Sequence, residues 1–341
     1  MRRSTRSTAP GRTSGQILPF PDRSRRQLPA IELEAVRQAQ GRFRQYVRRT
    51  PIMQAWLPSV PSCASAPIYL KLENLQLGGT ADVRGVLNFA LSLPPEQLSR
   101  GLVTAAWGNV GSAVSYIGQL LGISTTVYMV RPFASSEKVA AIERWGARVI
   151  VHGANWVTTE RAAAEHAASL GAPYIHPFAD PTVIAGDATV ALEVVENVRD
   201  LATLVVPASA GGGLISGVAL AAKSINPEIR VIGVEVDRVA RFHSSRLAGR
   251  PADVPPTARR LGPRRPARIN FELVQRYVDE IVLVSDQEII ESLHVLWQEL
   301  EVSASRYGVT GVSAVLHDRI SRPDNGSLCV IVGASGEEGL F

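Results

Sequence analysis

The feature that most constrains the fold of this 341-residue chain is a regular alternation of short apolar segments with longer amphipathic ones. The apolar segments predict strands at residues 67–73, 102–105, 125–129, 148–152, 204–207, 231–236 and 328–332. The amphipathic segments predict helices at residues 31–48, 83–93, 111–121, 135–145, 156–170, 189–198, 214–224 and 286–301. Strands that alternate with helices through short connections predict an α/β fold with a mostly parallel sheet flanked by helices.

The length of the chain predicts two lobes rather than one. We expect a small domain over residues 102–181, inserted into a large domain formed by residues 31–101 and 182–341. Ligands of parallel sheets bind at the carboxyl ends of the strands. The two loops expected there span residues 106–111 and 208–214.

Residues 1–30 form a basic segment that holds seven arginines and one acid, Asp22. A second group of five arginines lies between residues 259 and 268, in a stretch interrupted by prolines. The net charge of +5 and the pI near 9.5 could suggest nucleic-acid binding. Neither group has interleaved aromatic residues or a helical basic stripe, so we expect no nucleic-acid site. We interpret residues 1–30 as a disordered tail, with an organelle transit peptide as the alternative.

The number of cysteines and the lengths of the apolar runs narrow the class of protein further. Cys63 and Cys329 are the two cysteines, and their spacing implies neither a disulfide framework nor a metal site. The longest apolar runs are too short to span a membrane. We therefore expect a cytoplasmic protein with no metal and no membrane partner.

The strongest chemical motif is the sequence Pro207-Ala-Ser-Ala-Gly-Gly-Gly-Leu214, which leads from a strand into a helix. Consecutive glycines let backbone N–H groups converge, and a helix N-terminus adds partial positive charge. This pattern predicts an anion site, most simply for a phosphate. A close turn between strand and helix without any ligand is the alternative.

Several other motifs occur in an order and spacing that resemble one enzyme family, from about residue 31 to the C-terminus. They are Lys71-Leu-Glu-Asn-Leu-Gln76 with Gly79-Thr-Ala-Asp-Val-Arg-Gly85, Thr104-Ala-Ala-Trp-Gly-Asn109, Trp145-Gly-Ala-Arg-Val149, Ala185-Gly-Asp-Ala-Thr-Val-Ala-Leu-Glu193 and Gly233-Val-Glu235. Together with the glycine loop they resemble the fold-type-II enzymes of pyridoxal phosphate, the tryptophan synthase β-like fold. The branch that they resemble most is that of the threonine/serine ammonia-lyases and serine racemases.

This resemblance implies a set of functional properties. The family holds pyridoxal phosphate as an aldimine of a lysine and acts on amino acids, with the cofactor ring as the electron sink. The resemblance also implies a homodimer, although a role as a partner subunit stays open. It assigns Asn109 to the substrate loop, and Ala210, Gly211, Gly212, Gly213 and Leu214 to the phosphate cradle.

The sequence departs from the family pattern at the most reactive position, where the resemblance puts Asp82 in place of the lysine. A carboxylate cannot form an aldimine. The chain has three lysines in all, Lys71, Lys138 and Lys223, and the pattern gives none of them the role of the missing one. In the substrate loop, the indole of Trp107 replaces a small residue and would fill space that the substrate carboxylate normally occupies.

Other positions around the same pocket also differ. Ala210 replaces the first glycine of the cradle, and the usual glutamate of a C-terminal motif is missing from residues 308–312. The serine that meets the pyridine nitrogen would be Ser335 only if the register slipped by two residues. These coordinated changes indicate a degenerate or retuned site, at which pyridoxal phosphate could bind only without the usual covalent link.

Three hypotheses follow. The first is a non-catalytic homologue, a partner, scaffold or regulatory subunit that keeps the fold and could bind a small phosphorylated or amino-acid ligand. The second is a repurposed lyase-type enzyme in which Asp82 acts as acid or base, with Thr80 and Asn109 orienting the ligand. The third is an orthodox dehydratase or lyase in which Lys71 or an external amine replaces the missing lysine. A structural alternative for Asp82 is that its side chain caps the following helix.

Overall fold

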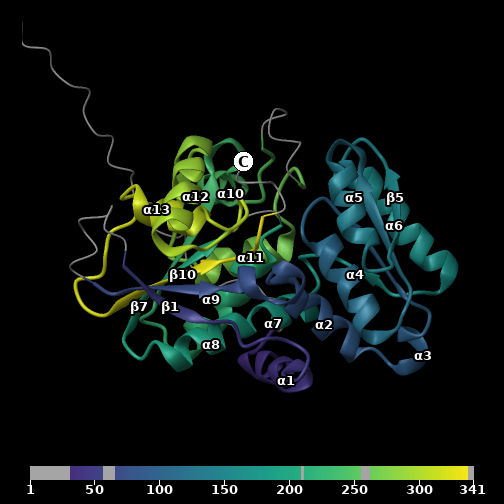
Figure 1. The fold of residues 1–341 in the computed structure, drawn as a ribbon, viewed down its shortest axis with the longest axis horizontal. Helices are drawn as coiled ribbons and strands as arrows, with labels where there is room; N and C mark the ends of the chain where they lie inside the picture. Colours follow the sequence, from purple (N-terminus) through teal and green to yellow (C-terminus); the bar gives the residue numbers. More distant parts are fainter. Residues whose placement is uncertain (1–30, 57–65, 209–210, 255–261, 337–341) are drawn as a thin grey trace, which may run out of the picture.

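A computed structural model describes residues 31–56, 66–208, 211–254 and 262–336. Within these ranges the chain forms two sheets, each covered by helices, which lie next to each other (Figure 1). The expected α/β fold with parallel-rich sheets is confirmed. The predicted basic tail at residues 1–30 lies outside the described residues, as do Cys63 and Ala210.

The larger sheet has six strands in the order β1-β2-β10-β7-β8-β9, and only the β1–β2 pair is antiparallel. Its strands are β1 (Ile52–Ala55), β2 (Ile68–Leu72), β7 (Leu201–Pro207), β8 (Arg230–Val236), β9 (Glu280–Val284) and β10 (Ser327–Val332). The central strands β10, β7 and β8 are predominantly apolar because both of their faces are buried.

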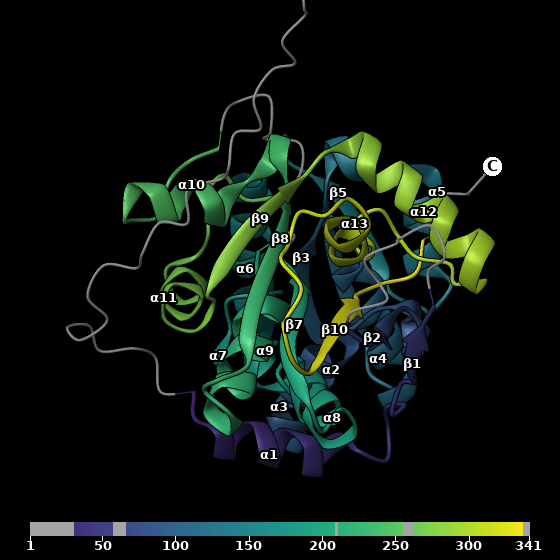
Figure 2. The same cartoon turned by 90° about the vertical axis from the view of Figure 1, so that its left-hand side faces the viewer.

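Helices cover both faces of this sheet (Figure 2). The helices of one face are α1 (Leu33–Phe43), α7 (Pro181–Asp187), α8 (Thr189–Asn197), α9 (Gly213–Ile225) and α11 (Arg268–Tyr277). The opposite face packs against α12 (Asp286–Leu300) and α13 (Thr310–Leu316). Successive residues of β7 point to opposite faces of the sheet. Leu204 and Val206 pack in the core on the side of α9, and Val205 packs in the core on the side of α12 and α13.

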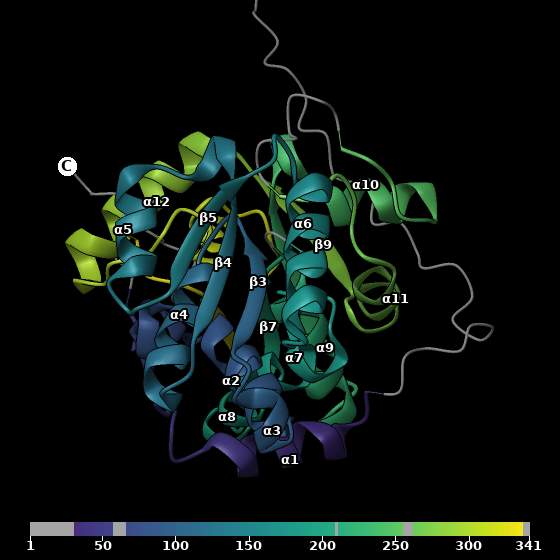
Figure 3. The ribbon, with the colours of Figure 1, turned by 90° about the vertical axis from the view of Figure 1, so that its right-hand side faces the viewer.

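The smaller sheet has four parallel strands in the order β5-β4-β3-β6. They are β3 (Leu102–Ala106), β4 (Thr125–Val130), β5 (Arg148–His152) and β6 (Tyr174–Ile175). Figure 3 shows α6 (Trp156–Leu170) on one face, with α4 (Val110–Leu121) and α5 (Ser136–Glu143) on the other. All four strands fall inside residues 102–181, the segment predicted as a small domain; the division into two domains itself stays a prediction.

The remaining helices join these layers. The helix α2 (Asp82–Ser92) follows β2 and packs against both α7 and α4, so it bridges the two sheets. Two shorter helices are α3 (Pro95–Leu98) and α10 (Arg241–Ala248). None of the helices in the described ranges combines the length and hydropathy that a bilayer span needs.

Sequence periodicity predicted most of these elements to within a few residues, but α1 is shorter than expected. The prediction ran to residue 48, whereas the helix ends at Phe43. Beyond that point the backbone N–H of Arg48 donates to the side chain of Gln76 at 2.9 Å, and the Gln76 amide donates back to the Arg48 carbonyl at 2.8 Å. This exchange satisfies the backbone of Arg48 outside a helix.

Candidate ligand-binding cavity

A cavity of about 600 Å³ opens at the carboxyl ends of strands from both sheets. The residues that directly follow β3, β7 and β10 contribute to its lining, namely Trp107, Ala208 and Gly333, and so does Arg238, two residues after the end of β8. This is the place where open parallel sheets bind ligands. Both predicted loops, residues 106–111 and the described part of 208–214, lie at this cavity.

The glycine loop brings the start of α9 to the cavity wall. Gly212 has a φ of 81°, the left-handed region that favours glycine, and it directly precedes the helix. A Cβ on Gly211 would lie 1.9 Å from the ring of Phe178, and one on Gly212 would lie 2.2 Å from the ring of Phe242. The two rings therefore exclude any side chain from these positions. The N–H groups of the first turn of a helix have no intrahelical partner, so this wall can hold an anion.

Asp82 is the first residue of α2 and lines the same cavity. The alternative that its side chain caps this helix is wrong. Ala81 holds the N-cap position, and Asp82 Oδ2 accepts a hydrogen bond from the Thr80 hydroxyl at 3.0 Å instead of from a backbone N–H group. Burial raises the pKa of Asp82 from 3.8 to about 6, and the Thr80 hydrogen bond offsets part of this shift.

Asp187, at the end of α7, is a second carboxylate on the cavity wall and is only 2% exposed. Its Oδ1 accepts a hydrogen bond from the Gly85 N–H at 3.1 Å. Its Oδ2 lies on the glycine-loop side, 3.1 Å from the position that a Cβ on Gly213 would take. Burial, together with the charge of Asp82, raises the pKa of Asp187 well above its ordinary value. Two interacting acids in one cavity titrate as a pair.

The interpretation of Lys71 as a replacement for the missing lysine is wrong. Its side chain is 0% exposed and does not line the cavity. The ammonium donates to the Thr50 carbonyl at 2.8 Å and forms an ion pair with Glu193. This burial could not be predicted, because strand periodicity alone does not show which lysine finds acidic partners.

Lys71 belongs to a buried charge network with Glu73, Arg84 and Glu193. Arg84 makes two hydrogen bonds to Glu73, both at 2.8 Å, and one to Glu193 at 2.7 Å. Burial by itself raises the pKa of Glu73, but Arg84 and Lys71 lower it below its ordinary value. Two cations and two anions thus neutralise each other inside the protein, away from the cavity.

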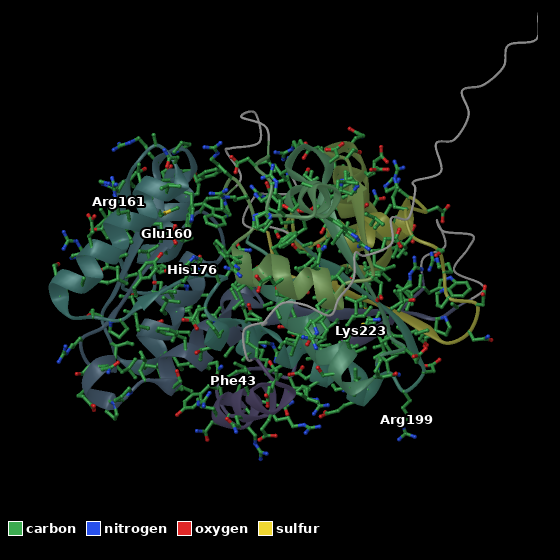
Figure 4. All side chains as sticks on the ribbon, turned by 180° about the vertical axis from the view of Figure 1, so that it is seen from behind. Phe43, Glu160, Arg161, His176, Arg199 and Lys223 are labelled. Carbon is green, nitrogen blue, oxygen red and sulfur yellow. The ribbon has the colours of Figure 1, made fainter. Side chains whose placement is uncertain are left out.

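The other two lysines lie in different places. Lys223 is on α9, where its ammonium pairs with Asp279 at 2.7 Å (Figure 4). Lys138 lines the cavity from the first turn of α5, on the side of the smaller sheet. Sequence reasoning gave Lys138 no role at the site, because nothing in its helix predicted which way its side chain points.

Trp107 lines the cavity but also packs sideways into a group of aromatic residues. Its ring centroid lies 4.2 Å from that of Trp156 and 5.5 Å from that of Phe178, both in edge-on geometry. Next to this group, His176 lies 3.1 Å from Glu160 (Figure 4). The indole is therefore held by its neighbours as one wall of the cavity.

Two further residues of the predicted site reach the cavity. Asn109 lies at the start of α4 and lines it. Ser335 lines it as well, and its hydroxyl donates to the Gly79 carbonyl at 3.1 Å. The Ser335 N–H donates to the same carbonyl at 2.8 Å, which ties the end of the chain's last strand to the segment before α2.

Sequence reasoning missed a buried carboxylate and a buried guanidinium that also line the cavity, those of Glu235 and Arg241. Glu235, at the end of β8, accepts hydrogen bonds from the N–H groups of Arg241, Phe242 and His243 at 2.8–3.1 Å. Burial raises the pKa of Glu235 to about 7 even with these donors present. The Arg241 guanidinium donates to the Pro263 carbonyl at 2.6 Å. The Gly-Val-Glu motif was the available signal, but it did not show that this carboxylate holds the start of α10.

The raised pKa of Asp82 gives a prediction about stability. In the unfolded chain this carboxyl ionises near pH 3.8, and in the folded protein only near pH 6, so ionisation opposes folding as the pH rises through this window. Asp82→Asn removes that penalty. We expect the unfolding free energy of the variant, relative to the wild type, to increase by about 1–3 kcal/mol between pH 4 and pH 8.

Urea denaturation at a series of pH values measures this difference. Asp324→Asn, which changes an exposed carboxylate outside the cavity, serves as the control and should show no such trend. A difference between Asp82→Asn and wild type that stays constant with pH would contradict the raised pKa.

Comparison with known proteins identifies the family. A sequence profile of the pyridoxal-phosphate dependent enzymes matches residues 43–333. The chain is 38% identical over 290 residues to an L-threonine ammonia-lyase of Thermotoga maritima, covering 84% of this chain and 71% of that protein. It is 35% identical over 290 residues to a serine racemase of Arabidopsis thaliana, covering 84% and 86%.

A solved structure agrees with these sequence relatives. The structure of maize serine racemase superposes with a TM-score of 0.82 at 30% identity, covering 90% of this chain and 94% of that one. The chain therefore belongs to the family of pyridoxal-phosphate dependent enzymes.

Proposed function

We propose that this chain is a non-canonical member of its family that binds a small phosphate-bearing ligand and does not perform the family's lysine-based chemistry. The observation that carries this proposal is Asp82, which the motif places where the family has its lysine and which lines a cavity of about 600 Å³. A cavity of this size, with a glycine loop on its wall, supports ligand binding.

The residues of the cavity do not fit pyridoxal phosphate in the form in which the family holds it. Its covalent attachment requires an amine at the start of α2, and Asp82 offers a carboxylate there. Lys71 and Lys223 are engaged in ion pairs elsewhere. Lys138 reaches the cavity from α5, a different element from the one that carries the family's lysine motif.

The phosphate end of such a ligand fits better than its reactive end. The wall formed by residues 211–214 presents the N-terminus of a 13-residue helix to the cavity. The partial charge of that helix end favours an anion. Since Ala210 lies outside the described residues, the predicted contribution of that residue to the cradle stays a prediction.

A reduction experiment tests the proposal. The purified chain is incubated with pyridoxal phosphate, reduced with borohydride and measured by intact mass. We expect no stoichiometric adduct on any lysine, because no amine stands at the start of α2. In parallel, the melting temperature should be higher in inorganic phosphate than in a phosphate-free buffer of the same ionic strength.

Two results would contradict the proposal. A stoichiometric adduct on Lys138, located by peptide mapping, would restore lysine-based chemistry to the chain. A melting temperature that responds neither to phosphate nor to phosphorylated ligands would remove the binding function and leave a scaffold or subunit role. A homodimer, implied by the family resemblance, stays a prediction.

One observation favours a second function, that of an acid–base enzyme. The pKa of Asp82 near 6 suits proton transfer at neutral pH, and Thr80 holds one of its oxygens in place. In this case the chain would turn over an amino acid or a phosphorylated metabolite. Asp82→Ala would then abolish turnover while the circular dichroism spectrum and the melting transition stay unchanged. Turnover by this variant at the wild-type rate would exclude Asp82 as the acid or base.

A further inference from the structure

Two carboxylates, Asp82 and Asp187, lie on the wall of a cavity to which Lys138, Arg238, Arg241 and Arg306 also contribute. Among the described residues, neither Asp82 nor Asp187 has an ion pair within 4.0 Å. Arg84, whose charge lowers the pKa of Asp187, is bound to Glu73 and Glu193. A carboxylate removed from bulk water needs either a counter-charge or a proton.

The positions of the two acids suggest different roles. Asp187 Oδ2 faces the glycine loop and accepts no hydrogen bond from any residue in the described ranges, although the side chain is only 2% exposed. Burial and the charge of Asp82 favour the protonated form of Asp187, and in that form Oδ2 can donate a hydrogen bond to an anion held at this loop. Asp82 stands at the start of α2 on the cavity wall, with one oxygen bound to Thr80 and the other without a hydrogen bond from any described residue.

We propose that the ligand of this cavity is a phosphorylated primary amine, whose phosphate lies at residues 211–214 and whose ammonium group pairs with Asp82. This inference rests on the phosphate-binding function proposed above and names the class of ligand. An ammonium ion supplies the counter-charge that Asp82 lacks in the protein, and the N–H groups of α9 together with Asp187 bind the phosphate. An aldehyde at the same place offers Asp82 no positive charge.

Matched pairs of ligands test this assignment, because they differ only in the group that would face Asp82. Pyridoxamine 5′-phosphate and pyridoxine 5′-phosphate share ring and phosphate but carry an amine or a hydroxyl. O-phosphoethanolamine and 2-hydroxyethyl phosphate form the equivalent pair without a ring. Each ligand is titrated calorimetrically into the full chain at pH 7.5.

We expect the amine of at least one pair to bind roughly tenfold more tightly than its hydroxyl partner, which equals about 1.4 kcal/mol. In Asp82→Asn this preference should fall to within about twofold, since an amide keeps the shape and loses the charge. Asp324→Asn should keep the full preference. A preference for the amine in the ring pair alone would show that the site requires an aromatic ligand. A preference in both pairs would show that an open-chain ligand is sufficient, and both results support the assignment.

The outcomes separate this inference from the function on which it rests. If inorganic phosphate and the four ligands bind but neither amine is preferred, the ammonium site is wrong and phosphate binding stands. If Asp82→Asn keeps the preference for the amine, Asp82 is not the group that binds the ammonium, and the inference is equally overturned. If none of the phosphate compounds binds, the proposed function itself fails.

Discussion

Replacing Arg84 by methionine should lower the unfolding free energy by about 3–5 kcal/mol, the range found when one member of a buried ion pair is removed. Arg84 is 1% exposed and binds Glu73 and Glu193 at once. Without it, two buried carboxylates share the single positive charge of Lys71. Urea or thermal denaturation of the variant measures the loss.

A matched control exists on the surface of the same protein. Arg49 also pairs with a glutamate, Glu196, at 2.6 Å, but the two side chains are 58% and 52% exposed. Water and salt screen this pair, so Arg49→Met should cost less than about 1 kcal/mol. Equal losses for the two variants would contradict the view that burial makes the Arg84 network important for stability.

Replacing Asp82 by lysine should convert a chain that forms no cofactor adduct into one that forms a single adduct with pyridoxal phosphate. The new side chain would start from the first residue of α2 and point into the cavity that the glycine loop lines. The lysine amine must lose its proton before it can attack the aldehyde, so adduct formation should rise with pH. Intact mass after borohydride reduction measures the yield, and peptide mapping locates the adduct.

Asp82→Arg provides the control, since a guanidinium carries the same charge and forms no stable adduct of this kind. If Asp82→Lys gives no adduct while inorganic phosphate still stabilises the variant, residue 82 does not occupy the attachment position. The motif alignment on which the proposed function rests would then be wrong.

The sequence predicted much of the fold because burial on both faces leaves a clear pattern. The apolar strands β7, β8 and β10 were found to within three residues at their ends. Elements with weaker patterns were missed: β6 has two residues, and α11 begins at Arg268, the last arginine of a stretch with several prolines. Short or irregular segments owe their structure to tertiary contacts, which periodicity does not record.

The candidate site was predicted less evenly. Asn109, Asp82 and the glycine loop were named from motifs, and all of them line one cavity. The placement of Lys71 failed because its partners, Thr50 and Glu193, are distant in sequence. The contacts of Asp187 could not be foreseen either, since its two oxygens contact α2 and α9, which only the folded chain brings together.

The buried charge network also bears on how relatives of this chain are to be compared. Lys71, Glu73 and Arg84 match the family's motif at three positions, yet in this chain they hold the frame together and take no part in the cavity. Asp82 lies between Glu73 and Arg84 in sequence, but it lines the cavity. The percentage of identical residues therefore reflects the buried charge network more than the residues of the cavity. Two family members can share most of this motif and still bind different ligands. For assigning activities within the family, the single residue at the start of α2 carries more information than the motif around it.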